Sequence, residues 1–387
     1  MRFSFRSIRR VVRIWERLRE RSQKCIASPD CQVVVSVQAG LCSEVGPVSD
    51  DETSTRTRAR VTLHDVAREA GVSKSTVSRM LDERLPNSDS PRARKVREVA
   101  QRLGYVRDVS AASLRRGTTG TIGVIVPRLT DTVMAMLYEA ISAAAAEQGR
   151  FAIVATTDDN PDASRKAAEA LIRRGVDGLI LTTAREGDHF ADELRDRGVR
   201  FVFALRHNGT SAASVGDDQL GGYLATRHLL DLGHKRIGIL AGPDYATSAL
   251  GRLAGYRQAL TEAGIPQAQE LIVATTFSIE SGETAARTLL ALPDPPTAIF
   301  AINDNMAIGS MSAIAQEGLS VPGDISLVGY NDIPIVSRLP VPLTTVRVPF
   351  DRVAEVALRL LFEDGQESVV RKITPSLIPR KSTAPRS

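Results

Sequence analysis

VTLHDVAREAGVSKSTVSRML, residues 61–81, contains two short apolar patterns separated by one glycine. Thr62 is a residue type that caps helices, and the apolar positions after it recur at helical spacing: Leu63, Val66, Ala67 and Ala70. Gly71 ends this first helix, and Ser73 caps a second one whose inward face consists of Val77, Met80 and Leu81. The stretch therefore predicts two short helices joined by a tight glycine turn.

A third helical pattern follows a polar loop. Ser90 and Pro91 form a cap and a first-turn proline, and Gly104 ends a pattern whose apolar positions are Val96, Val99, Ala100 and Leu103. Three short helices with a tight turn between the first two describe a helix-turn-helix, which we expect over residues 60–107.

The second helix of this arrangement has a polar outer face: Lys74, Ser75, Ser78 and Arg79. In a helix-turn-helix, the first residues of the second helix reach base edges in the major groove of DNA. Arg79 can pair with guanine through two hydrogen bonds, and serine hydroxyls suit bases or phosphates. A small helical bundle with a solvated polar face is the alternative interpretation.

The charge of the chain is unevenly distributed. Of a formal net charge of +5, residues 1–24 carry +7 and residues 56–117 carry +8, whereas residues 25–55 carry −5 and residues 118–387 carry −5. The basic N-terminal part of the chain (residues 1–117) precedes a mildly acidic body (residues 118–387). This asymmetry indicates that the N-terminal part binds a polyanion. A large charged surface that is merely solvated is the alternative interpretation.

Length and composition are those of an ordinary soluble protein: 387 residues, 43% hydrophobic and 25% charged, enough for two or three domains. All three cysteines lie in the first 42 residues, at a spacing unlike that of a zinc knuckle. No apolar run reaches the ~18 residues that a membrane span needs. We interpret residues 1–58 as a basic, disordered extension or a mistaken start, with an amphipathic helix or a transit-like segment as alternatives, and we expect a cytoplasmic protein.

After residue 118 the pattern changes to apolar runs of strand length alternating with helical stretches. The runs are TIGVIV (121–126), FAIVA (151–155), GLIL (178–181), RFVFAL (200–205), RIGIL (236–240), TAIFAI (297–302) and ISLVG (325–329). Continuously apolar strands that alternate with helices predict parallel sheets covered on both faces. The pattern is long enough for two such doubly wound sheets facing each other across a cleft, which is a natural site for a small molecule.

No enzyme motif stands out: the chain lacks G-x-S-x-G, a P-loop, H-E-x-x-H, and G-x-G-x-x-G after a strand. We therefore expect no enzymatic activity, no cofactor and no metal site. A nicotinamide-dependent enzyme would need the missing phosphate-binding fingerprint. A two-lobed binding protein for uptake is the main rival, but it would need an export signal and would have no use for residues 62–117.

The chain resembles the lactose-repressor/galactose-repressor family of bacterial transcriptional regulators. The resemblance rests on TLHDVAREAGVSKSTVSRML, VREVAQRLGY, TIGVIVP, LGHKRIGILAGP, AINDNMAIGSMSAIAQEGLSVPGDISLVGYNDIP and PLTTVRVPF, and it covers roughly residues 60–384. It implies an α/β protein with a helix-turn-helix domain, a hinge helix at 108–117 and a periplasmic-binding-protein-like body at 119–384. The first lobe is expected at about 119–232 and 350–372, and the second at about 233–348 and 373–384.

By this resemblance several residues match operator-contacting positions: Thr62, Ser73, Lys74, Ser75, Thr76, Ser78 and Arg79. Leu114 matches the leucine that wedges into the minor groove, and Ala111 would lie close to the groove floor. YVRD (105–108) stands where the family usually has Tyr-x-Pro-Asn, which removes a rigid entry to the hinge helix. The expected partners are double-stranded operator DNA and a second copy of the chain, in a homodimer, with no membrane.

The resemblance also implies a small-molecule effector, with a sugar or sugar derivative as the leading class. The matching positions are Arg206, Asp217, Arg252, Phe277, Asn303 and Asn331. Arg252 matches an arginine that grips ligand hydroxyls or carboxylates, whereas Asn331 stands where an aspartate is commoner. DTVMAM (131–136) replaces the usual turn after the first strand of the body, so Val133 and Met134 make that wall more apolar.

Leu114 provides a first prediction. An apolar wedge partly unstacks a base step and kinks the duplex, so Leu114→Ala should lessen operator bending and weaken specific binding while the body stays folded. The bend angle is measured by circular permutation or energy transfer. An unchanged angle would rule out the wedge.

Overall fold

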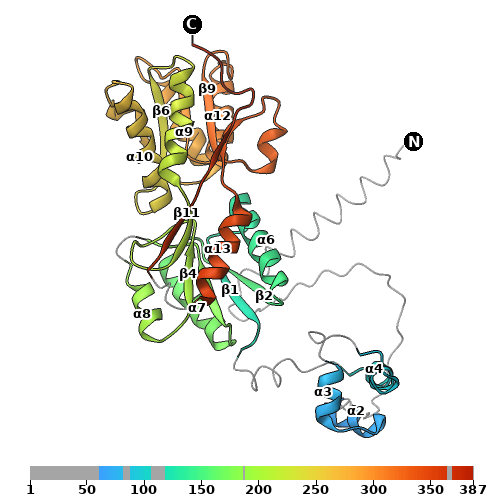
Figure 1. Ribbon diagram of the computed structural model, residues 1–387. Helices are drawn as coiled ribbons and strands as arrows, with labels where there is room; N and C mark the ends of the chain where they lie inside the picture. The colour runs from blue at the N-terminus through green and yellow to red at the C-terminus, as the bar shows by residue number, and fades with distance from the viewer. Residues whose placement is uncertain (1–60, 82–87, 106–117, 186–187, 364–367, 387) are drawn as a thin grey trace, which may run out of the picture. The chain divides into compact units, whose positions relative to one another are not determined.

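The computed structural model describes residues 61–81, 88–105, 118–185, 188–363 and 368–386 (Figure 1). The chain divides into two compact units, one ending at Tyr105 and the other starting at Val106. The hinge helix expected at 108–117, with Ala111 and Leu114, and the extension at 1–58 both lie outside the described residues.

The first unit is the expected three-helix domain. It consists of α2 (Leu63–Ala70), α3 (Lys74–Met80) and α4 (Pro91–Leu103). Gly71 and Gly104 end α2 and α4 in the left-handed conformation that glycine adopts without strain. The three helices share a small core in which Val66, Val77 and Val96 are fully buried. The helix-turn-helix prediction is confirmed.

The second unit contains two six-stranded sheets, one in each lobe. The first sheet has the strand order β11-β5-β4-β3-β1-β2, and all its strands pair in parallel. Its strands are β1 (Thr121–Val126), β2 (Phe151–Thr156), β3 (Gly178–Leu181), β4 (Phe201–Ala204), β5 (Ala213–Gly216) and β11 (Val370–Ile373). The helices of this lobe are α6 (Thr132–Glu147), α7 (Pro161–Arg173), α8 (Phe190–Asp196) and α13 (Phe350–Phe362), of which α6 and α13 lie side by side (Figure 1).

The second sheet has the order β12-β10-β9-β8-β6-β7, with only the edge strand β12 antiparallel to its neighbour. Its strands are β6 (Ile237–Gly242), β7 (Ile272–Ala274), β8 (Ala298–Ala301), β9 (Ser326–Asn331), β10 (Thr344–Arg347) and β12 (Ser376–Ile378). Its helices are α9 (Asp218–Asp231), α10 (Thr247–Glu262), α11 (Ile279–Leu290) and α12 (Asp304–Gln316), with two 3₁₀ turns, η1 (Gln269–Leu271) and η2 (Pro334–Ser337).

The seven apolar runs are all strands, as predicted; six of them lie inside the sheets, and β2 is an edge strand. Five further strands had no such signal: β5, β7, β10, β11 and β12. They are only three or four residues long, which is too short for a clear apolar run; β7, β11 and β12 are edge strands, whereas β5 and β10 lie inside their sheets.

The chain crosses between the lobes earlier than predicted. The expected first lobe extended to residue 232, but α9 packs against α10 and against the second-sheet strands β8, β9, β10 and β12. The crossing therefore falls at Asp217, between β5 and α9. The reason is close packing: a Cβ on Gly222 or Gly255 would overlap the backbone of the facing helix, so these glycines let α9 and α10 approach each other.

None of the described helices is both long enough and apolar enough to span a bilayer.

Asp304, the first residue of α12, is a fully buried carboxylate without a cationic partner among the described residues. One carboxylate oxygen accepts a hydrogen bond from the Thr345 hydroxyl at 2.6 Å, and the other accepts from the Ile333 amide at 2.8 Å. Burial raises the pKa of Asp304 from its ordinary 3.8 to about 7, and nearby Asp332 adds to the rise. The group is therefore protonated more readily in the folded protein than in the unfolded chain.

This difference predicts a pH dependence of stability. The folded protein binds one more proton than the unfolded chain between pH 4 and pH 7, so the free energy of unfolding should fall over that range, by about 4 kcal/mol for this group. Asp304→Asn retains an acceptor for the Ile333 amide and should flatten this part of the profile. Thermal unfolding at a series of pH values measures how the free energy of unfolding changes with pH in the wild type and in the variant. Equal slopes in the two proteins would contradict the assignment.

Candidate functional site

The outer face of α3 is available for a polyanion. Lys74, Ser75 and Arg79 are exposed, and no ion pair joins either cation to another described residue. Ser73 caps the helix: its hydroxyl accepts from the Thr76 amide at 3.2 Å and lies 2.8 Å from the hydroxyls of Ser75 and Thr76. Lys74 and Ser75 thus lie in the first turn of α3, where a helix-turn-helix places its base-reading residues, and Arg79 lies in the last turn of the same short helix.

Thr62 performs the capping role that its position predicts. It forms a reciprocal capping box with Asp65, in which the Thr62 hydroxyl accepts from the Asp65 amide at 3.4 Å and the Asp65 carboxylate accepts from the Thr62 amide at 3.0 Å. The Thr62 hydroxyl also donates to that carboxylate at 2.7 Å. These bonds hold the pKa of Asp65 below its ordinary value. Ser78 is half-buried beside the exposed Arg79 on α3.

A cleft of about 790 Å³ lies between the two lobes of the body. First-lobe and second-lobe segments both line it, and five of its polar side chains lie at or just after strand ends: Asp131, Asp159, Arg206, Asn303 and Asn331. Arg252 reaches the cleft from helix α10. Its apolar lining includes Val133, Met134, Tyr245, Phe277, Ile308 and Ile333. The size and the mixed lining are those of a small-molecule site at a switch point of doubly wound sheets.

Arg252, on α10, is only 7% exposed and is held firmly by its own lobe. Its Nε donates to Asp218 at 2.8 Å, and its Nη1 donates to the Ile302 carbonyl at 2.6 Å. The guanidinium lies 3.7 Å from the centre of the Tyr330 ring, whose hydroxyl donates to the same Asp218 oxygen at 3.3 Å. Arg252 thus lines the cleft and at the same time joins α10 to α9 and β9.

Arg206, which follows β4, is the centre of a contact between the lobes. Its Nη1 lies 3.0 Å from both carboxylate oxygens of Asp159, and Asp159 also accepts from the hydroxyl of Tyr245 in the second lobe at 3.1 Å. Arg185 stacks 3.9 Å above the Tyr245 ring. Burial and the Asp159 charge raise the pKa of Tyr245, so its hydroxyl stays protonated and donates.

Three predicted second-lobe residues also line the cleft. Asn303 caps α12 by accepting from the Met306 amide at 2.7 Å, and its amide donates to the Phe277 carbonyl at 3.0 Å, which positions the Phe277 ring. Asn331 is buried at φ 102°, and no described residue forms a hydrogen bond with its side chain. The Asn331 amide is therefore the side chain in this group that is free to bind a ligand.

Asp217 lies outside the cleft, contrary to the prediction. It caps α9 by accepting from the Leu220 amide, and Lys372 lies 3.5 Å from its carboxylate at the crossing between the lobes. Its neighbour Asp218 reaches Arg252 instead, because one step along the first turn of a helix changes the direction of the side chain by about 100°. Asp218 and Asp159 were not among the residues predicted from the sequence, because no local pattern distinguishes them from the acids beside them, Asp217 and Asp158.

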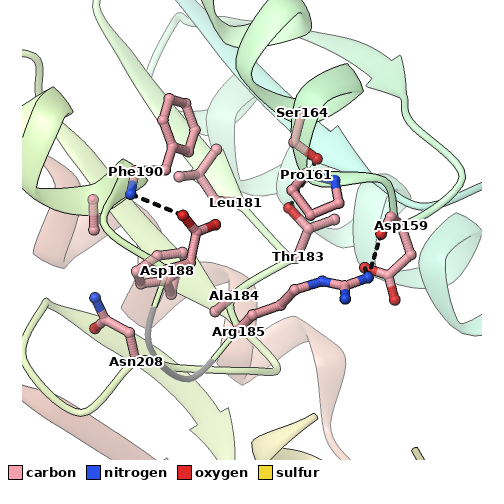
Figure 2. Close-up of a pocket in the computed structure, with 12 residues that line it drawn as sticks. Asp159, Pro161, Ser164, Leu181, Thr183, Ala184, Arg185, Asp188, Phe190 and Asn208 are labelled. Atoms are coloured by element: carbon pink, nitrogen blue, oxygen red, sulfur yellow. Dashed lines mark hydrogen bonds and ion pairs between the residues drawn. The ribbon is translucent and has the colours of Figure 1, made fainter. Parts of the chain in front are cut away.

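A second hollow lies within the first lobe, beside Ser164, Thr183 and Asn208 (Figure 2). Its volume of about 10 Å³ is enough for roughly one water molecule. In Figure 2 Arg185 points toward Asp159, and its Nη2 donates to the Asp159 carbonyl at 2.5 Å. The Arg185 side chain at this hollow thus holds the Asp159 loop, and the hollow itself is too small for an effector.

A helix-turn-helix unit followed by a two-lobed body with a polar cleft defines the class of ligand-responsive, DNA-binding transcriptional regulators. Residues 62–108 match the model of bacterial regulatory proteins of the lacI family, and residues 226–383 match the periplasmic binding protein-like domain. The chain belongs to the lacI family, since relatives more than 30% identical align over nearly their whole length.

Two curated relatives illustrate this relationship. The transcriptional regulator DegA of Bacillus subtilis is 33% identical over 84% of this chain and 99% of its own length. The transcriptional repressor PurR of Mannheimia succiniciproducens is 33% identical over 83% of this chain and 98% of its own length.

Solved structures agree with the observed fold. The lac repressor dimer bound to operator and the anti-inducer ONPF is 31% identical, covers 84% of this chain and 100% of its own, and superposes with a TM-score of 0.76. The complex of the transcriptional regulator CelR with cellobiose is 28% identical, has the same coverage, and superposes with a TM-score of 0.64.

The buried pair predicts a structural cost for Arg252→Ala. The substitution leaves the Asp218 charge buried without its partner, and about 3–5 kcal/mol of stability should be lost. The double variant Arg252→Ala/Asp218→Ala should lose less than the sum of the two single losses. Denaturant unfolding of the wild type, the two single variants and the double variant gives a double-mutant cycle. Strictly additive losses would show that the pair contributes no coupling energy.

Proposed function

We propose that the protein is a homodimeric transcriptional repressor in the cytoplasm, with no enzymatic activity, whose operator affinity changes when a sugar or sugar derivative binds in the cleft. The observation that carries the proposal is that one chain combines two features: an exposed basic face of α3 that forms no ion pair with a described residue, and a two-lobed cleft with a buried amide, Asn331, to which no described side chain or backbone group bonds. The sugar class is supported by the CelR complex with cellobiose, whose fold this body shares.

On the DNA side, we assign base reading to Arg79 and Lys74 and phosphate or base contacts to Ser75, Thr76 and Ser78. The capping hydroxyls of Thr62 and Ser73 lie at the helix starts, where backbone amides also face outward, which suits contacts to phosphate. A basic first unit on an acidic body fits this division of roles.

On the effector side, a ligand changes operator affinity only if it binds the DNA-competent and incompetent forms unequally. Lobe closure is the natural two-state element, because the polar groups that line the cleft come from both lobes. Closure would shift the first lobes of the dimer and so the spacing of the two segments at 108–117.

Locating the operator by sequencing the DNA bound in the cell tests the proposal as a whole. Enrichment of one near-palindromic sequence is the expected result, and random coverage would overturn the assignment. The neighbouring genes would indicate which sugars to test.

Arg79→Ala should cost about 1–3 kcal/mol of operator affinity and relax specificity at one base pair of each half-site. Binding to the operator, to operators altered at single positions and to random DNA is compared at one salt concentration. An equal loss on specific and random DNA would assign Arg79 to a phosphate.

Asn331→Gly should abolish the response to ligand and leave basal operator binding unchanged. Glycine adopts the φ of 102° without strain, so the substitution removes the amide and leaves the backbone intact. Operator affinity is titrated against a sugar panel for the wild type and the variant. A variant that responds at the same ligand concentrations as the wild type would place the ligand elsewhere.

A further inference from the structure

Asp131 presents an acceptor to the cleft that the protein itself leaves unused. The residue caps α6, and its Oδ1 accepts from the Val133 amide at 3.1 Å and from the amide of Asn305, on the facing lobe, at 3.3 Å. No described residue donates to its Oδ2, and Asp131 lines the cleft. Burial raises the pKa of the carboxyl, and its two hydrogen bonds and the more distant charges of Arg128 and Arg206 offset that rise only in part.

The arginines of the cleft, by contrast, already have counter-ions. Arg206 is neutralised by Asp159, and Arg252 is neutralised by Asp218. At the rim, Arg128 lies 4.0 Å from Asp158. Asp131 is therefore the deep charge in the cleft without a partner of opposite sign among the described residues.

The charge balance of the cleft is negative. Three arginines line it against four carboxylates (Asp131, Asp158, Asp159 and Glu280). Behind these, Asp218 pairs with Arg252, and Arg185 lies 4.0 Å from Asp159. An anionic ligand would enter an environment with one excess negative charge. It would also have to compete with Asp159 or Asp218 for a guanidinium, leaving a buried carboxylate unpaired, which is costly.

A ligand with hydrogen-bond donors fits this environment better. A hydroxyl or an ammonium can donate to Asp131 Oδ2 in a charge-assisted hydrogen bond, and the Asn331 amide can accept from a hydroxyl or donate to one. Neither contact requires either arginine to leave its carboxylate.

We propose that the cleft selects its effector by charge, with Asp131 as the specificity-determining acceptor. The effector class is an uncharged or amine-bearing polyhydroxylated molecule, and phosphorylated or carboxylated counterparts are rejected. This inference rests on the proposed function, because it assumes that the cleft is the effector site.

The test uses the full-length protein and two matched probe sets. One contains glucose, glucosamine, glucose 6-phosphate and glucuronate, and the other contains cellobiose, the disaccharide of two glucosamines, and cellobionate. Thermal unfolding midpoints and titration calorimetry report binding of each probe. In at least one set, the affinity of the neutral or the amine member should be at least about tenfold higher than that of the anionic members. A difference of this size corresponds to one hydrogen bond to a charged group. Whether the neutral or the amine member binds more tightly shows whether a hydroxyl or an ammonium of the ligand donates to Asp131.

Asp131→Asn tests the residue itself. The variant retains an oxygen that caps α6 but replaces the free Oδ2 with an amide nitrogen, so the discrimination against anionic probes should fall about tenfold or more. Asp324→Asn is the matched control: it also removes one carboxylate that accepts from a backbone amide, at 2.8 Å from Ser320, on an exposed loop. The control should keep the discrimination of the wild type.

Three outcomes would overturn the proposal: an anionic probe that binds as tightly as its neutral partner, an Asp131→Asn variant with unchanged discrimination, or no binding of any neutral or amine probe. Failure of the proposed function is recognised separately, by the absence of an operator in the DNA-binding experiment. A protein that binds its operator but prefers anionic probes would refute only the charge selection.

Discussion

The buried ion pair between Arg252 and Asp218 is the interaction on which the geometry of the body depends. It joins the first residue of α9 to the second turn of α10, at the point where the chain has just crossed between the lobes, and it lies against the Tyr330 ring. Glycines at 222 and 255 let these two helices pack in close contact. The pair therefore sets where the wall of the cleft lies.

The contacts between the lobes depend on this arrangement. Tyr245 reaches Asp159 and Asn305 reaches Asp131, so each of these second-lobe side chains donates to a carboxylate of the first lobe. Both carboxylates follow strands of the first sheet, and both lie at the cleft. A ligand that binds there necessarily touches the groups that hold the lobes together, which gives ligand binding a physical route to lobe closure.

In both units, residues that cap helices also lie at the surfaces expected to bind a ligand. Thr62 and Ser73 cap the starts of their helices and lie on the face expected to meet DNA, and Asn303 and Asp131 cap helices at the cleft. A helix start leaves unpaired amides that a short polar side chain must satisfy, so such residues are held in fixed positions. Fixed polar groups at helix starts are then available for recognition at little further entropic cost.

The sequence by itself determined the helix-turn-helix, because caps, glycine stops and apolar spacing act within a few residues of one another. It also determined seven of the described strands, because strands that are covered on both faces require unbroken apolar runs. Five of the six predicted effector residues line the cleft, and four of them (Arg206, Phe277, Asn303 and Asn331) lie at or just after strand ends of the kind that meet at a switch point. Only the tertiary structure decided that α9 belongs to the second lobe, that Asp218 rather than Asp217 meets Arg252, and that Asp131 forms no ion pair with a described residue. Each of these depends on which distant segment lies opposite a side chain, and that information is absent from local spacing.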